Sequence, residues 1–219
     1  MSASPLRKLF WIGSPFFAPA LTACGWQIHI FNFEYMAVFT WDDLVRMAGW
    51  EPDVVVVADK SRPPFVVGME QFPCVTVFYC VDSHIHSYYP LYAQAFDVCL
   101  VSLKDHMHTF LAKKLCAEQV WWFPAFAPDI SLESAAASAH TDFIWDCLFV
   151  GTVDAATNRA RAEFLAALKN LVPSLHVTHG DYRNLFPQGR ILLNHCAAGD
   201  LNFRVFEAMG CGGCLLTPA

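Results

Sequence analysis

Short apolar runs alternate along the chain with segments in which apolar residues recur at helical spacing. The runs have the length of β-strands and lie at 8–13, 26–32, 53–58, 74–81, 96–102, 119–123, 145–150, 175–178, 190–195 and 213–217. Helical spacing between them predicts helices at 41–48, 105–116, 157–171 and 201–209. Runs such as DVVVV and DCLFVG are continuously apolar, which is typical of parallel strands covered on both faces. The alternation predicts an α/β fold with mostly parallel sheets.

The segment 123–142 divides this pattern into two parts. It combines two prolines with a run rich in alanine and serine, and the strand-loop-helix order restarts after it. We therefore predict two Rossmann-like lobes, 1–125 and 142–219, joined by a linker at 126–141. A cleft between two such lobes is the usual ligand site of this architecture. The sequence stops just after an apolar strand, so the second lobe is predicted to be incomplete at its C-terminus or completed by another chain.

Composition narrows the class of protein further. Among 219 residues, 14 Lys and Arg stand against 20 Asp and Glu, which gives a net charge of −6, and hydrophobic residues make up 55%. This composition excludes a disordered chain and argues against a protein that binds nucleic acid through a basic face. No apolar run reaches the roughly 18 residues that a transmembrane helix needs. We therefore expect a globular protein with no transmembrane segment and no nucleic-acid partner.

The pattern of the nine cysteines indicates in which cellular compartment the protein resides. Their number is odd and most lie in apolar runs, which predicts buried, reduced thiols in a cytoplasmic protein. The C-x-x-C motif from Cys211 to Cys214 follows a helical segment and enters a strand, whereas a redox motif stands at a helix start. The N-terminus resembles a signal peptide, with a basic pair before an apolar run. Pro15 and Pro19 would break a helix there, so we favour a first buried strand.

Polar and charged residues that could bind a ligand are concentrated in the segment NHCAAGDLNFRVFEAMGCGG. Asp200 or Asn202 can cap the short helix that this segment predicts. On this otherwise apolar helix, Arg204 and Glu207 are three residues apart and share one face. An ion pair is the simplest interpretation, but the cation lies toward the helix N-terminus, against the dipole. We therefore expect separate partners: a phosphate for Arg204 beside the helix N-terminus, and ribose hydroxyls for Glu207.

A second candidate lies at the start of the second lobe. Gly151 and Thr152 follow a buried strand and precede a helix that carries Arg161. A glycine there lets a ligand approach the backbone, although an ordinary turn is the simpler interpretation. Neither the P-loop motif nor the dinucleotide-binding G-x-G-x-x-G occurs, which weighs against a P-loop NTPase and a standard NAD enzyme.

A third candidate lies at a strand end in the first lobe. Asp82 and His84 follow the strand at 74–81, where they could act as a general base or bind substrate hydroxyls. Together with His86 they could instead bind a metal ion, but further ligands are not evident nearby.

Three segments together resemble the CgeB-like, spore-maturation-type glycosyltransferases, which belong to the group-1 glycosyltransferases of GT-B fold. The segments are VDSHIHSYYPLYAQAFDVCLVSLKDHM, DCLFVGTVDAATNRARAEFLAAL and RILLNHCAAGDLNFRVFEAMGCGGCLLT. The resemblance implies a bacterial enzyme with two Rossmann-like lobes. Such an enzyme moves a sugar from a nucleotide-diphosphate sugar to a hydroxyl acceptor, which is a glycan, lipid or protein, and uses neither a metal ion nor another cofactor.

The resemblance also implies roles for individual residues. Glu207 falls on the family's FEA-x-x-x-G element, whose glutamate holds the donor ribose in related enzymes. Arg204 and Asn202 fall on the family's LN-x-R positions, and Asp82 and His84 match a VDSH stretch in the acceptor lobe. The same donor site is expected to include Gly151, Thr152, Arg161, His195 and Asp200.

One departure from the family pattern leaves a second interpretation open. Many retaining GT-B enzymes carry another glutamate eight residues before the ribose glutamate, where this sequence has Gly199. Together with the incomplete second lobe, this keeps a non-catalytic or fragmentary nucleotide-sugar-binding scaffold as the alternative function. A metal hydrolase built on Asp82, His84 and His86 is a third hypothesis.

Overall fold

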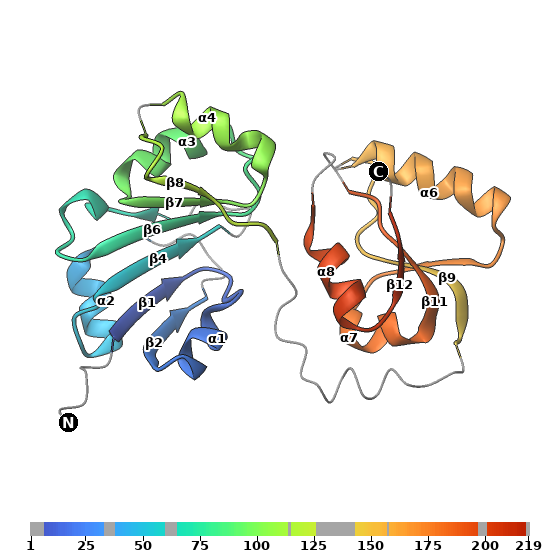
Figure 1. Cartoon of the computed structure of the whole chain (residues 1–219), viewed down its shortest axis with the longest axis horizontal. Coiled ribbons are helices and arrows are strands. Elements are labelled where there is room, and N and C mark those ends of the chain that lie inside the picture. The colour runs from blue at the N-terminus through green and yellow to red at the C-terminus, as the bar shows by residue number, and fades with distance from the viewer. Residues whose placement is uncertain are drawn as a thin grey trace. The chain divides into compact units, whose positions relative to one another are not determined.

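The chain divides into two compact units, Met1–Pro124 and Ala125–Ala219 (Figure 1). The computed structural model describes residues 7–32, 38–59, 65–113, 115–125, 143–156, 158–196 and 201–217. The predicted linker, 126–141, lies outside the described residues.

The first unit is built on a parallel six-stranded sheet with the order β2-β1-β4-β6-β7-β8 (Figure 1). Its strands are β1 (Arg7–Ile12), β2 (Trp26–Phe31), β4 (Val54–Ala58), β6 (Val75–Cys80), β7 (Val98–Val101) and β8 (Val120–Trp122). All neighbouring pairs run parallel. A separate parallel pair joins β3 (Val38–Phe39) to β5 (Phe65–Val66).

Short helices connect these strands. They are α1 (Ala18–Ala23), α2 (Trp41–Ala48), α3 (Tyr89–Tyr92) and α4 (Met107–Leu111), with 3-10 turns η1 (Met69–Gln71), η2 (Ala93–Ala95) and η3 (Lys104–His106). The first buried strand favoured at the N-terminus forms as β1, and no helix runs through Pro15. The short helix α1 was not predicted; Pro19 lies in its first turn, where the missing N–H costs no hydrogen bond. The helix predicted at 105–116 is shorter, since it begins as η3 and α4 ends at Leu111.

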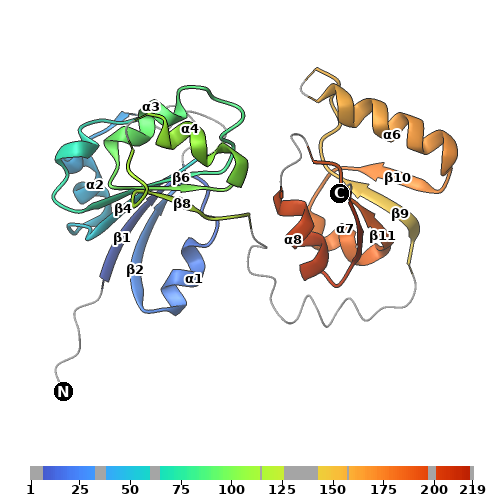
Figure 2. The same cartoon turned by 45° about the horizontal axis from the view of Figure 1, so that its top comes forward.

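The core of the first unit follows from the continuous apolar strands. Val55 and Val57 of β4 pack with the buried side chains of Leu44 in α2, Tyr89 in α3 and Phe110 in α4. Figure 2 shows these three helices on the same side of the sheet. Alternate residues of a strand point to opposite faces, and β4 is buried throughout almost its whole length.

The second unit contains a parallel four-stranded sheet with the order β10-β9-β11-β12. Its strands are β9 (Trp145–Val150), β10 (Leu175–Thr178), β11 (Gly189–Leu193) and β12 (Cys214–Leu216). Its helices are α6 (Arg159–Leu171), α7 (Tyr182–Leu185) and α8 (Phe203–Gly210), with the 3-10 turn η4 (Phe186–Gln188). Leu165 of α6 packs with Phe149, while Ala208 of α8 packs with Leu148 and Val150. Helix α6 therefore covers one face of this sheet and α8 the other (Figure 2).

The predicted fold class is confirmed: both units are Rossmann-like α/β layers with parallel strands. Each of the ten predicted strands forms, and its ends move by two residues at most. The strands β3 and β5 were not predicted, because a strand of two residues leaves no periodic signal. No helix among the described residues is both long enough and apolar enough to cross a bilayer.

The cysteine prediction is partly wrong. All nine thiols are free. Those of Cys80, Cys99, Cys147 and Cys211 are buried, as expected. Those of Cys24, Cys116 and Cys214 are exposed, because they stand in a helix end, a turn and an outer strand rather than in the core.

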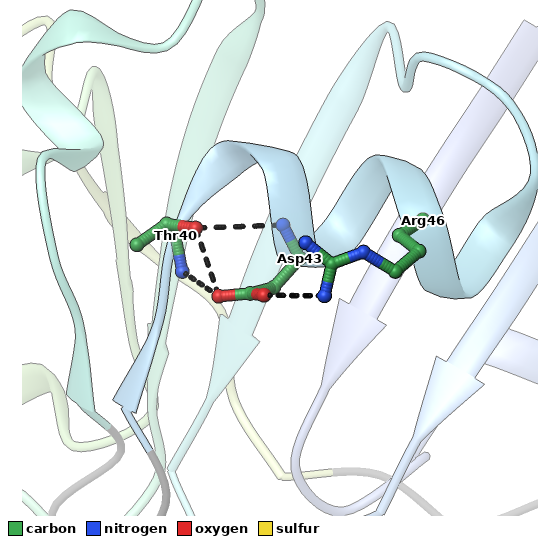
Figure 3. A network of polar contacts seen from close by, with 3 residues as sticks. All are labelled: Thr40, Asp43 and Arg46. Atoms are coloured by element: carbon green, nitrogen blue, oxygen red, sulfur yellow. Dashed lines mark hydrogen bonds and ion pairs between the residues drawn. The ribbon is translucent and has the colours of Figure 1, made fainter.

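Helix α2 begins with a capping box (Figure 3). The Asp43 amide donates to Thr40 Oγ1 at 3.4 Å, and the Thr40 amide and hydroxyl donate to Asp43 Oδ2 at 3.0 and 2.8 Å. Arg46 Nη1 contacts Asp43 Oδ1 at 3.1 Å. The hydrogen bonds from Thr40 lower the pKa of Asp43 below its ordinary value of 3.8. The helix predicted at 41–48 is confirmed.

We expect Thr40→Ala to lower the free energy of unfolding by about 1 kcal/mol, because it removes the N-cap. The pKa of Asp43, measured by NMR titration, should rise toward 3.8, since the largest cause of its depression is lost. In the wild type this carboxylate stabilises the fold above pH 3.8 and ceases to do so as the pH falls through its folded pKa. Thr22→Ala, at an exposed position inside α1, is the control. An equal loss in both variants contradicts the capping role.

Candidate functional site

The strands of the second sheet bring several predicted residues to one edge. Gly151 directly follows β9, Asn194 follows β11, and Thr217 follows β12. These strands are parallel and adjacent, so their carboxyl ends meet at the same edge. We call it the donor edge, because the sequence analysis expects the donor site here. Ligands of open α/β sheets bind outside the carboxyl ends of the strands.

Arg204, in the first turn of α8, reaches this edge. Its Nε donates to the Val150 carbonyl at 2.7 Å and its Nη1 to Asn194 Oδ1 at 3.1 Å. The guanidinium carbon lies 4.7 Å from the centre of the Phe149 ring. In the described part of the chain, no ion pair joins Arg204 to Glu207. The two residues are one turn apart and do not form an ion pair, although the charge of Arg204 still acts on the Glu207 carboxyl group.

Arg161 reaches the same edge from the first turn of α6. Asn158 caps this helix by accepting the Arg161 amide at 3.0 Å. The Arg161 side chain donates through Nε to the His195 carbonyl at 3.1 Å and through Nη1 to the Thr152 carbonyl at 3.2 Å. Its guanidinium carbon lies 5.9 Å from the centre of the Phe149 ring. Two guanidinium groups from two helices thus contact one buried aromatic ring.

The donor edge has the chemistry of an anion-binding site. The hydrogen bonds described for the two guanidinium groups include main-chain carbonyls and an amide oxygen as acceptors, and both arginines are half-buried. The N-termini of α6 and α8 add the positive ends of two helix dipoles. Arginine forms paired, charge-assisted hydrogen bonds with phosphate oxygens.

Three predicted residues serve this edge differently from what the sequence suggested. At Gly151 a Cβ atom would overlap the Nη2 atom of Arg204, so the absent side chain makes room for that arginine. Asn202 is the N-cap residue of α8, but its side chain makes no capping bond and donates to Asn194 Oδ1 at 3.2 Å. The His195 ring packs on Phe164, with centroids 4.7 Å apart.

The remaining predicted residues of this edge are Thr152 and Asp200. Thr152 is exposed, and Asp200, like Gly199, lies outside the described residues.

Glu207 is half-buried on α8, and the nearby positive charges belong to Arg204 on the same helix and Arg183 on α7. Burial raises the pKa of its carboxyl group above the ordinary 4.5, while the positive charges of Arg204 and Arg183 oppose this rise. The charge of Glu207 in turn raises the pKa of Tyr182, for which burial is the larger cause. A carboxylate that is kept partly out of water is costly to the fold and is a common feature of functional sites.

In the first unit, Asp82 and His84 lie in the loop after β6. The Asp82 amide donates to Asp59 Oδ2 at 2.9 Å. Tyr89 donates its hydroxyl to Asp59 Oδ1 at 2.6 Å. His84 is exposed, and its ring centroid lies 6.5 Å from that of His106.

Sequence reasoning missed Asp59, which is only 1% exposed. Its signal is a carboxylate directly after the apolar run of β4, at the carboxyl edge of the first sheet. By accepting from the loop and from Tyr89, Asp59 fixes the start of the segment that carries Asp82 and His84. Among the described residues, no group of three or more His, Cys, Asp or Glu could hold a metal ion.

The fold and the donor edge define a Rossmann-like α/β protein with two arginines at one sheet edge of its second unit. Residues 143–219, which contain that edge, match a protein-family model described as glycosyl transferase-like. The match is confined to the second unit, which is therefore similar to glycosyl transferase-like proteins.

Comparison with solved structures supports the fold. The crystal structure of HepE from Anabaena in complex with UDP and glucose has a TM-score of 0.54 and 11% sequence identity, covering 97% of this chain and 80% of that chain. A Listeria monocytogenes protein assigned as a UDP-N-acetylglucosamine 2-epimerase is also 11% identical and covers 99% of this chain and 70% of that one, but its TM-score of 0.40 carries no argument. The comparison with curated protein sequences gave no match.

We expect Glu207→Gln to stabilise the fold at pH 7. The folded-state pKa of Glu207 is raised, so its ionisation favours the unfolded chain, and the wild type loses stability as the pH rises from 4.5 through the folded pKa. The thermal midpoint of the variant should exceed that of the wild type at pH 7, and the gain should vanish below pH 4.5. Glu163→Gln, at an exposed residue paired with Arg159, is the control and should give no gain. A gain independent of pH contradicts this account.

We expect Gly151→Ala to displace Arg204, because the new Cβ overlaps the movable end of that side chain. The NMR signal of the Arg204 Nε–H group, bonded to Val150 in the wild type, should lose its protection from exchange. Gly180→Ala is the control, because Gly180 also has a positive φ, of +148°, yet its nearest neighbour would be Leu185 Cδ1 at 3.2 Å. An unchanged Arg204 signal in Gly151→Ala contradicts the close packing described here.

Proposed function

We propose that the protein is a glycosyltransferase that moves a sugar from a nucleotide-diphosphate sugar to a hydroxyl acceptor. The observation that carries this proposal is the pair of guanidinium groups, Arg161 and Arg204, at the donor edge. The glycosyl transferase-like match to residues 143–219 supports it. HepE, which shares the fold, binds UDP and glucose in its crystal structure, and this supports a nucleotide-sugar donor.

The donor edge supplies what such a transfer needs. When the sugar leaves, negative charge develops on the diphosphate, and fixed cationic groups stabilise that charge in the transition state. We assign this task to Arg161, Arg204 and the N-terminus of α8 at Asn202. Because two guanidinium groups provide the charge, the proposed transfer is independent of a metal ion and of other cofactors.

The remaining donor residues are assigned to the nucleotide. Glu207 accepts hydrogen bonds from the ribose hydroxyls. Its carboxylate suits this role because it is partly buried and gains a partner when the ribose binds. Gly151 and Thr152 border the diphosphate. The proposed set is completed by His195 and Asp200.

We assign the acceptor to the first unit. Asp82 or His84 would take the proton from the attacking hydroxyl, as a general base, and Asp59 holds the Asp82 backbone in place. We further propose that the protein belongs to the CgeB-like, bacterial group and acts in the cytoplasm. The acceptor is a glycan, lipid or protein hydroxyl.

We expect wild-type protein to bind UDP or GDP, and Arg204→Ala to weaken that binding about 10- to 100-fold. The loss corresponds to one or two charge-assisted hydrogen bonds. Binding of the matching nucleoside, which has no phosphate, should not change. The measurement is isothermal titration of each ligand. Arg190→Ala removes an exposed arginine of β11 that contacts Asp146 at 3.8 Å, and this control should bind as the wild type does.

Failure of the wild type to bind either diphosphate contradicts the proposed function. Binding without hydrolysis or transfer of a UDP- or GDP-sugar identifies a non-catalytic nucleotide-sugar-binding protein instead. Asp82→Asn and His84→Ala then separate the two candidate bases, because loss of the base lowers kcat without weakening UDP binding.

A further inference from the structure

The loop after β6, residues 81–88, carries both candidate bases of the proposed reaction, and we call it the acceptor loop. Its first two residues are held by side chains from neighbouring strand ends. The hydroxyl of Ser102, which follows β7, donates to the Val81 carbonyl, and Asp59, which follows β4, accepts the Asp82 amide at 2.9 Å. Asp59 and Ser102 are 1% and 4% exposed, so the loop begins on buried, well-packed groups.

The third residue of the acceptor loop is held by a histidine. Ser83 Oγ lies 3.0 Å from His106 Nδ1, which is a hydrogen-bond distance, and both residues are half-buried. The tautomer of the imidazole decides which of the two groups donates. With either tautomer, the bond holds the residue that joins Asp82 to His84.

His106 is itself placed by a well-ordered backbone. The strands β6 and β7 are parallel, and Cys80 pairs with Val101, so their carboxyl ends lie side by side. The turn η3 follows β7 and ends at His106, whose amide donates to the Leu103 carbonyl at 3.0 Å. The Thr109 hydroxyl donates to the His106 carbonyl at 2.7 Å. The imidazole therefore reaches the acceptor loop from a backbone that is fixed on both sides.

A neighbouring histidine makes a different kind of contact. His108, in α4, is exposed, and its Nδ1 lies 2.6 Å from the Asp105 carbonyl within its own turn. His84 is exposed on the acceptor loop, with its ring centroid 6.5 Å from that of His106. The side-chain hydrogen bond of His106, in contrast, links two segments that follow different strands.

Such a link matters for proton transfer. A general base works only when it lies within hydrogen-bond reach of the proton that it takes, and a displacement of about 1 Å can slow a reaction about 100-fold. The bonds at Val81 and Asp82 fix the start of the acceptor loop. The bond at Ser83 extends the fixed segment to the residue before His84, and so restricts the directions in which the Asp82 and His84 side chains leave the loop.

We propose that His106 is a positioning residue, which orients the acceptor loop and its candidate bases through the hydrogen bond to Ser83. This inference rests on the proposed function. His106 acts here through its hydrogen bond and takes up no proton, so a side chain that keeps the bond without titrating should replace it. Asparagine is such a side chain, because its amide offers a donor and an acceptor at about the distance of Nδ1 from the backbone.

The first test needs no ligand and follows hydrogen exchange of the Ile85 amide, which donates to the Asp82 carbonyl at 2.9 Å within the acceptor loop. His106→Ala and Ser83→Ala should each accelerate this exchange about fivefold or more, because the loop loses one hydrogen bond. His106→Asn should restore most of the protection. His108→Ala is the control and should leave the exchange unchanged, since His108 bonds within its own turn.

A second amide separates loop ordering from general destabilisation. The Asp59 amide donates to the Tyr79 carbonyl at 2.8 Å between β4 and β6, and its protection should persist in every variant. An equal loss of protection at Asp59 and Ile85 identifies a general structural effect and overturns the inference. Unchanged exchange of Ile85 in His106→Ala overturns it too.

The second test measures the release of UDP from UDP-glucose, or of GDP from GDP-mannose, with water as the acceptor. In His106→Ala, kcat should fall about tenfold or more, while the dissociation constant of the diphosphate should stay constant, because the residues assigned to the donor lie in the second unit. His106→Asn should recover most of the lost kcat. If His106→Asn is as slow as His106→Ala, the imidazole itself is required and the positioning role is wrong.

The remaining outcomes separate this inference from the proposed function. If the wild type releases the diphosphate and His106→Ala keeps the wild-type kcat, the positioning role is wrong and the proposed function stands. Weaker binding of the diphosphate to His106→Ala indicates an effect beyond the acceptor loop and also overturns the inference. A wild type that binds no diphosphate, or binds it without releasing it from the sugar, overturns the proposed transfer and the positioning role together.

Discussion

The position of the Arg204 guanidinium depends on the parallel register of β9 and β11. Leu192 of β11 pairs with Leu148 of β9, which places the carbonyl of Val150 and the amide of Asn194 at the same height. Arg204 then bridges the two strand ends from the first turn of α8. A shift in the register of β9 and β11 would change the acceptor of each of these hydrogen bonds. The pairing of the two strands therefore determines the position of Arg204 at the donor edge.

The charged residues near this edge affect the stability of the fold in different ways. Burial raises the pKa of Glu207, so its charge is a cost to the folded state at neutral pH. The arginines, in contrast, are well satisfied by carbonyl and amide oxygens. Partly buried carboxylates with a raised pKa are common at ligand-binding sites, where they lower the stability of the fold. Glu207 is such a carboxylate.

Much of the fold could be predicted because parallel strands covered on both faces leave continuous apolar runs. The strand β4 and the strand β9 are examples, and their bounds were nearly correct. Helix α1 is not predicted because the two prolines speak against a long helix in the N-terminal apolar run, whereas Pro19 fits the first turn of a short one. The strands β3 and β5 are too short to leave a pattern.

The separation of Arg204 from Glu207 could be anticipated, because their order opposes the helix dipole. The contacts of Asn194 and Asp59 could not. Asn194 donates to Thr217, 23 residues on, as well as accepting from Asn202 and Arg204. Asp59 accepts from Tyr89, 30 residues on. A single asparagine or aspartate after an apolar run has many uses, and only the packed sheet shows which atoms it meets.

Phe149 contacts both guanidinium groups while itself remaining buried in the core. The faces of an aromatic ring carry partial negative charge, so this side chain attracts two cations that would repel each other. A leucine would fill the same volume but offer neither of them any attraction. This core position therefore contributes the negative face of its ring as well as its bulk, and the interior of the domain helps to hold two positive charges at its surface.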